Sequence, residues 1–123
     1  MAQASDRDRL RHMLDFAEKA RELSKDRKRG DLDTDEMFAL AMARLLEVIG
    51  EAASRVSQTF QGRHPEIPWK LIIGLRNRLI HGYDTIDPDI TWQILTKDLS
   101  PLIESLEKIL ANGVPKTRKP KET

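Results

Sequence analysis

The segment RNRLIHGYD, residues 76–84, gathers polar and titratable side chains at the end of an otherwise apolar stretch. Its members with useful chemistry are Arg76, Asn77, His81 and Tyr83. A histidine can donate or accept a proton near neutral pH, and an arginine offers a fork of N–H donors to phosphate oxygens. RNA cleavage can proceed with these two functions, because the ribose 2′-OH serves as the internal nucleophile. The residue types are therefore suited to phosphodiester cleavage in RNA.

The geometry of this segment depends on where its helix ends. On a continuous helix Asn77 and His81 share a face, and Arg76 lies about 140° around the axis from His81. Gly82 is suited to a helix C-cap, which would let Tyr83 fold back toward the same place. A purely structural interpretation fits the same spacing, because Arg and His near a helix end often cap carbonyls or balance the helix dipole. Spacing alone leaves both interpretations open.

The order of the motif residues also resembles a known family. The stretch IGLRNRLIHGYDTID resembles the R-x(4)-H-x-Y signature of HepT-type proteins in the HEPN superfamily, with Arg76, His81 and Tyr83 at the motif positions. Upstream, RLLEVIGEAASRVS resembles the second helix of that family. The likeness extends over about residues 6 to 111, which is most of the chain.

The resemblance implies a metal-independent endoribonuclease toxin that needs no cofactor. Arg76 would stabilise the phosphate, His81 would transfer a proton, and Tyr83 would bind substrate and accept an inhibitory AMP. The implied partners are RNA, a second copy of the chain in a homodimer, and an MNT-type nucleotidyltransferase antitoxin that transfers the AMP. Asn77, from its predicted face, and Glu51, from its place in IGEAAS, are further candidates for substrate binding.

Apolar residues recur at helical spacing in four stretches, which predicts an all-α, HEPN-type antiparallel bundle of four main helices without strands. Ser5 and Asp8 resemble a capping box before the first helix, and Asp33 with Glu36 resembles the start of the second. The last helix contains Pro101, so we expect it to be kinked or broken near that residue. The expected helices span residues 6–26, 33–56, 68–81 and 88–111.

The composition is typical of a small helical protein and limits which kinds of site and which cellular location we expect. Of 123 residues, 39% are hydrophobic and 33% charged, and there is no cysteine, so disulfides and thiolate metal sites are excluded. No apolar stretch approaches the ~20 residues that span a bilayer, and the N-terminus lacks a signal-like apolar region, so we expect a cytoplasmic protein. We expect one domain over residues 1–112 and a disordered basic tail over 113–123.

Other functions remain open on the sequence. The main alternative is a non-catalytic helical dimer that binds a nucleotide, RNA or a protein. A metal-dependent enzyme using Glu47 and Glu51 would lack the Glu-x-x-His pattern of helical metal sites. The net charge is only +1, so phosphate contacts would need local basic clusters. Two such clusters exist: Lys25, Arg27, Lys28 and Arg29, and in the tail Lys116, Arg118, Lys119 and Lys121.

Overall fold

The computed structural model describes residues 5–81 and 85–113. Helices dominate this part of the chain, and its two strands are only two residues long each. Their order along the chain is α1 (Asp6–Ser24), α2 (Asp31–Thr34), α3 (Glu36–Ser54), α4 (Gln58–Arg63), α5 (Trp69–Ile73), α6 (Leu75–Leu79), β1 (Ile80–His81), β2 (Thr85–Ile86), α7 (Pro88–Gln93), the π-helix η1 (Ile94–Asp98) and α8 (Leu99–Ala111).

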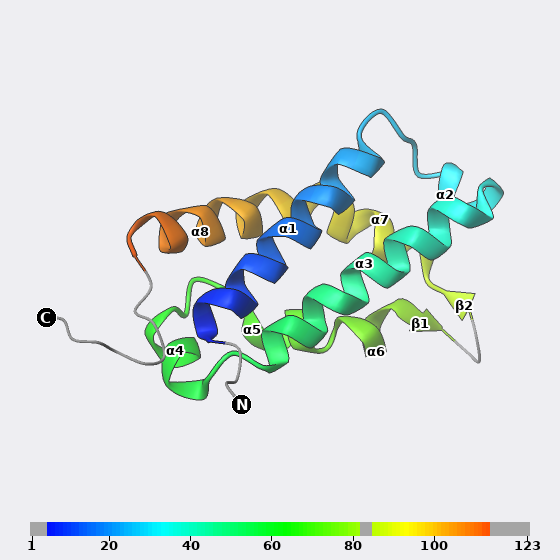
Figure 1. The fold of residues 1–123 in the computed structure, drawn as a ribbon. Coiled ribbons are helices and arrows are strands. Elements are labelled where there is room, and N and C mark those ends of the chain that lie inside the picture. Colours follow the sequence, from blue (N-terminus) through cyan, green and yellow to red (C-terminus); the bar gives the residue numbers. More distant parts are fainter. Residues whose placement is uncertain (1–4, 82–84, 114–123) are drawn as a thin grey trace, which may run out of the picture.

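Helix α1, helix α3, the α5–α6 segment and the α7–α8 segment run in alternating directions (Figure 1). Helix α1 lies beside α3 and α8, and α3 also packs on α5 and α6. The short helix α4 lies at one end of the molecule, and α2 and the β1–β2 pair lie at the other (Figure 1). The all-α prediction is therefore confirmed, with the addition of one antiparallel pairing between β1 and β2.

The first two long helices begin at side-chain caps. The Ser5 hydroxyl accepts from the Asp8 amide at 3.1 Å, and the Asp8 carboxylate accepts from the Ser5 amide at 3.2 Å, which completes the predicted capping box. For α3 the cap is Asp35, whose carboxylate accepts from the Phe38 amide at 3.1 Å. The expected start at Asp33 was wrong, because Asp33 belongs to the separate helix α2.

The third predicted helix is divided in two by Gly74. The Gly74 amide donates to the Lys70 carbonyl at 3.0 Å and ends α5, while the Gly74 carbonyl accepts from the Arg78 amide at 3.0 Å and starts α6. With ψ near 7°, Gly74 departs from helical geometry and offsets the two axes. The second half, α6, ends at Leu79 and does not reach His81.

We expected a kink or break near Pro101, and the structure has a π-helix that ends three residues before it. Helix η1 covers Ile94–Asp98, and the Leu99 amide donates to the Ile94 carbonyl, five residues back. Pro101 itself lies inside the first turn of α8. A proline has no amide donor for the carbonyl four residues earlier, and a wider turn upstream accommodates its ring.

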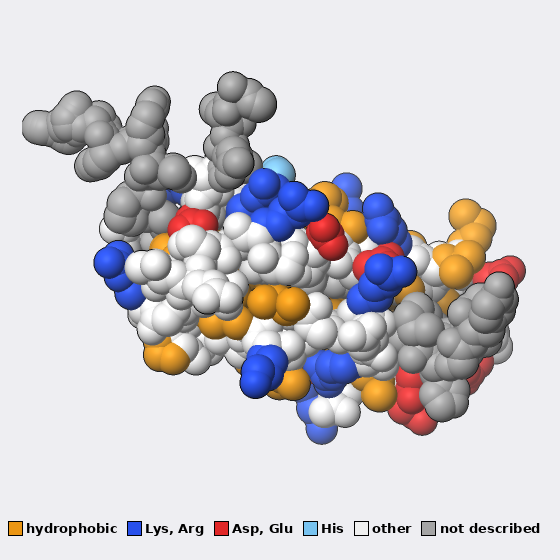
Figure 2. Space-filling view, turned by 90° about the horizontal axis from the view of Figure 1, so that it is seen from below, with side chains coloured by type: hydrophobic (Ala, Val, Ile, Leu, Met, Phe, Trp, Pro, Cys, Tyr) orange, Lys and Arg blue, Asp and Glu red, His pale blue; other side chains and the backbone are white. Residues whose placement is uncertain are grey.

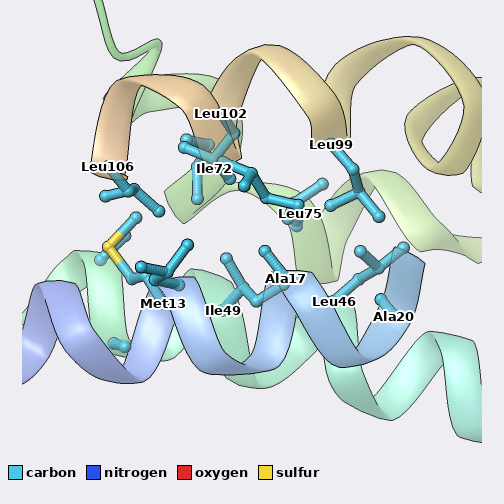
Figure 3. Packing of buried hydrophobic residues seen from close by; sticks show 14 of the residues in the cluster. Met13, Ala17, Ala20, Leu46, Ile49, Ile72, Leu75, Leu99, Leu102 and Leu106 are labelled. Atoms are coloured by element: carbon cyan, nitrogen blue, oxygen red, sulfur yellow. The ribbon is translucent and has the colours of Figure 1, made fainter. Parts of the chain in front are cut away.

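Side chains from α1, α3, α5, α6 and α8 form the hydrophobic core. Figure 3 shows part of this packing, with the labelled side chains Met13, Ala17, Ala20, Leu46, Ile49, Ile72, Leu75, Leu99, Leu102 and Leu106. The two short helices that the sequence did not predict, α2 and α4, each bury one residue, Leu32 and Phe60. Within the described ranges, none of the helices combines the length and apolarity needed to span a bilayer.

Candidate active site

Arg76 lies on an exposed flank of α6, beside its buried face and about 100° around the axis from Leu75. Leu75 and Leu79 are 4% and 1% exposed and anchor this short helix in the core, one turn apart. The Arg76 side chain is 74% exposed, and its Nε lies 3.3 Å from Oε2 of Glu47 on α3. The guanidinium is therefore accessible to a ligand and is held at α3 by a carboxylate.

The Glu47 carboxylate is shared between two arginines. Its second oxygen, Oε1, accepts from the Arg44 guanidinium at 3.2 Å, one helical turn away. The side chain of Glu47 is 32% exposed, which makes it the more enclosed partner of both pairs. One turn farther along α3, the Glu51 carboxylate accepts from Arg55 at 3.1 Å.

These residues line a groove of about 580 Å³ between α3 and the α5–α6 segment. Its walls are Arg44, Glu47, Val48, Gly50, Glu51, Ser54, Ile73, Arg76 and Asn77. A groove of this size falls within the range of small-ligand sites, roughly 300–1,000 Å³. The structure thus brings together three candidates from the sequence, Arg76, Asn77 and Glu51, and adds Glu47, which the sequence suggested only as a metal ligand.

A close approach between two backbones shapes this groove. A Cβ atom added at Gly50 would lie 2.6 Å from the Ile72 carbonyl oxygen, a separation that real side chains do not adopt. Only glycine therefore lets α3 and α5 come this near. This contact fixes the separation of the two helices near the ion pair of Arg76 and Glu47. Glu47 lies one turn before Gly50, and Arg76 lies four residues after Ile72.

The backbone at His81 differs from the expected helix. The Leu79 carbonyl accepts from the Asp87 amide at 2.8 Å, so the chain leaves the helix and Ile80–His81 pairs with Thr85–Ile86. The predicted shared helical face of Asn77 and His81 was therefore wrong. The side chain of His81 and all of residues 82–84, including Gly82 and Tyr83, lie outside what the structure describes.

The two carboxylates of the metal-enzyme alternative, Glu47 and Glu51, are both engaged by arginines. Among residues 5–79 and 87–113, whose side chains are described, no three Asp, Glu or His side chains converge as a metal site would require. Chemically, these residues offer an exposed arginine that can bind an anion.

Comparison with known proteins decides the family. The model of the HepT-like family, described as ribonuclease HepT-like, matches residues 13–109. The chain belongs to the HepT-like ribonuclease family. The matched span contains the groove and all three motif residues, Arg76, His81 and Tyr83.

Several relatives of this HepT-like chain are similar over nearly their whole length. A probable ribonuclease HepT of Thermococcus cleftensis is 31% identical over 85% of this chain and 96% of its own. A protein of Methanocaldococcus jannaschii named as a putative RNase is 35% identical over 80% of this chain and 90% of its own. A protein of Caldanaerobacter subterraneus with the same description is 34% identical over 82% and 90%. No solved structure shows a significant match.

The basic cluster at residues 25–29 of this HepT-like protein contains two arginines, Arg27 and Arg29, and both make structural contacts. Arg27 pairs with Asp35 at 3.1 Å and Asp31 at 3.7 Å, and its guanidinium lies 4.1 Å from the centre of the Phe38 ring. Arg29 donates hydrogen bonds to Asp89 and Asp33, both at 2.6 Å. These hydrogen bonds raise the pKa of Arg29, and the bond to Asp89 has the larger effect. These contacts join the loop before α3 to α7. They do not favour a phosphate site there, and the tail cluster, residues 116–121, lies outside the described residues.

Proposed function

We propose that this HepT-like protein is a metal-independent endoribonuclease whose site is the groove between α3 and α6 together with the His81–Tyr83 segment. The observation that carries the proposal is the accessible Arg76 guanidinium, 74% exposed in a groove, five residues before His81 in a chain of a ribonuclease family. The names of the relatives, which refer to RNase or ribonuclease HepT, support RNA as the substrate class.

In the proposed reaction the 2′-oxygen of a ribose attacks the adjacent phosphorus. The 2′-OH gives up its proton, the bond from phosphorus to the 5′-oxygen breaks, and that oxygen leaves with a proton. His81 takes part in proton transfer, and Arg76 binds the phosphate oxygens as negative charge develops on them. Because the nucleophile belongs to the substrate and the cation to the protein, the reaction needs no bound metal to generate either one.

The products test this chemistry directly. Attack by the 2′-oxygen leaves a 2′,3′-cyclic phosphate on one fragment and a 5′-hydroxyl on the other, which mass spectrometry distinguishes from linear 3′- or 5′-phosphates. An oligonucleotide with a single 2′-deoxyribose at the cleaved position should stay intact. Cleavage of that substrate at the same bond would refute the mechanism, and binding without cleavage of any RNA would favour the non-catalytic module.

Control by a partner enzyme is the second part of the proposal. An MNT-type nucleotidyltransferase would transfer AMP from ATP to the Tyr83 hydroxyl and release pyrophosphate. The added phosphate and nucleotide would compete with RNA for Arg76, because both place a negative charge beside the same guanidinium. Such control is what a toxin–antitoxin pair requires, since the active nuclease harms its own cell.

A homodimer is the third part, and exposed apolar side chains on α3 support it. Met37 and Leu40 are 82% and 60% exposed, and they lie one to two turns before Arg44 at the groove. A second copy packed on this face would bury them and bring a second groove close to the first. Leu40→Glu should therefore lower the mass measured by sedimentation to that of a monomer, whereas Leu23→Glu, 49% exposed on α1, should leave the dimer intact.

A further inference from the structure

The charges that line the groove cancel. Arg44 and Arg76 supply two positive charges, and Glu47 and Glu51 supply two negative charges. Figure 2, the view from below Figure 1, shows Lys and Arg side chains scattered over that face, with hydrophobic side chains and some Asp and Glu side chains between them. A groove without excess positive charge attracts a phosphate weakly unless one of its arginines changes partner.

Glu47 is the group that such an exchange must displace. Its Oε2 lies 3.3 Å from the Arg76 Nε, an ion-pair contact at the Nε edge of the guanidinium. A phosphate that binds Arg76 through two parallel hydrogen bonds needs such an edge. Exposed ion pairs are weak, whereas the bidentate pair with phosphate is strong, so the exchange is favourable once RNA lies in the groove.

The Glu47 carboxylate also fixes the position of the Arg76 guanidinium in the free protein. Arg44 holds the other oxygen, Oε1, at 3.2 Å, so Glu47 is restrained from both sides. An arginine on a short helix and 74% exposed would otherwise sample many rotamers. The close approach at Gly50 keeps the two helices at the distance this contact requires.

We propose that Glu47 is a positioning residue, which holds the Arg76 guanidinium at the groove in the free protein and releases it to the RNA phosphate on binding. The idea rests on the proposed ribonuclease function. It assigns Glu47 two opposite effects, since its contact orients Arg76 while its charge competes with the substrate. Two substitutions separate these effects: Glu47→Ala removes contact and charge, and Glu47→Gln keeps an oxygen that can accept from Arg76.

Steady-state cleavage of a short RNA measures both effects. For Glu47→Ala, KM should be about two- to tenfold higher than for Glu47→Gln, because a guanidinium that is not oriented in the free protein must be ordered on binding, while kcat should stay within about threefold of wild type. For Glu47→Gln, KM should fall about two- to fivefold while kcat stays within about threefold of wild type, because the charge alone is lost. The control is Asp15→Ala, which removes an exposed carboxylate from its pair with Arg11 on α1 and should leave both constants unchanged.

A binding cycle tests the link to Arg76 without any cleavage. The probe is an all-2′-deoxy oligonucleotide, which lacks the nucleophile, and its Kd is measured for wild type, Glu47→Gln, Arg76→Ala and the double variant. Glu47→Gln should tighten binding about two- to fivefold in the wild type and have no effect in the Arg76→Ala background.

The outcomes separate this inference from the proposed function. If the wild-type protein cleaves no RNA, the ribonuclease proposal fails, while the binding cycle still tests Glu47. Equal KM values for folded Glu47→Ala and Glu47→Gln, or an equal effect of Glu47→Gln on Kd with and without Arg76, overturns the positioning role. A rise in KM for Glu47→Gln overturns the competition with RNA.

Discussion

Gly50 of α3 and Ile72 of α5 approach so closely that a Cβ on Gly50 would lie 2.6 Å from the Ile72 carbonyl oxygen. The atom it would meet belongs to the backbone, so a side-chain rotation cannot relieve the clash. This contact joins the two walls of the groove about one turn from the pair of Glu47 and Arg76. Stability and site geometry are therefore coupled at one residue.

Gly50→Ala should destabilise the protein by about 1–3 kcal/mol, the usual cost of forcing extra volume into a packed contact. Urea denaturation monitored by circular dichroism measures this change. The matched control is Gly62→Ala in α4, where nothing lies within 4 Å of the added Cβ. That variant should be neutral or gain up to about 1 kcal/mol, because alanine favours helix. Equal stability of Gly50→Ala and wild type would contradict the close approach.

The same substitution should also change the site. Because α5 must move away from α3, the reach from Arg76 to Glu47 lengthens, and RNA cleavage should fall more than the loss of folded protein explains. The measurement is activity per folded molecule at a temperature well below the unfolding midpoint of Gly50→Ala. Full activity there would show that the groove does not depend on this contact.

Much of the fold could be predicted because it depends on local patterns. The apolar spacing of α1 and α3 located both helices, and the Ser5–Asp8 capping box set the start of the first. The helix break at Gly74 was missed, because a lone glycine in an apolar run often continues a helix. The short helices α2 and α4 were missed too, because they are too short to show apolar residues recurring at helical spacing.

The sequence named Arg76, Asn77 and Glu51, which the structure places along one groove, but it did not predict how they are arranged. The motif identified Arg76, but its partner Glu47 lies on another helix, and pairing between helices has no signature in one sequence. The end of α6 at Leu79 depends on the Asp87 amide, which comes from beyond the hairpin. Local spacing could not supply that bond, and so it placed His81 on a helix that had already ended.

The start of α3 should make stability depend on pH. The Phe38 amide, which donates to the Asp35 carboxylate, and then the Arg27 guanidinium hold the pKa of this carboxyl below its usual value. Because the folded pKa is depressed, this contribution to stability is present above the unfolded pKa of about 3.9 and is lost as pH falls through the folded value.

Asp35→Ala should therefore lower the thermal midpoint at pH 6, and its difference from wild type should shrink as the pH is taken down to about 2. The comparison variant is Asp15→Ala, whose carboxylate makes an exposed pair with Arg11 and caps no helix. It should change the midpoint little at either pH. A difference between Asp35→Ala and wild type that is the same at pH 6 and pH 2 would refute the role of the charged carboxylate.

Tyr83→Phe should free the nuclease from control by a nucleotidyltransferase. Tyr83 is the single tyrosine of the chain, so loss of its hydroxyl removes every tyrosine that could accept AMP. After incubation with an MNT-type enzyme and ATP, wild type should gain the mass of one adenylyl group and lose activity, and Tyr83→Phe should do neither. A variant that is still inhibited together with a gain of adenylyl mass would place the modification on another residue.

The ribonuclease assignment itself is tested most directly by cleavage of a mixed RNA in the presence of EDTA. The comparison is between wild type, shown by intact mass to carry no modification, His81→Ala, and the control His12→Ala, which changes an exposed histidine on α1. We expect wild type and His12→Ala to cleave the RNA and His81→Ala to be reduced by at least about 100-fold, the lower end of what a positioned proton-transfer group contributes. RNA left intact by folded, unmodified wild type, or cleaved equally well by His81→Ala, would contradict the account.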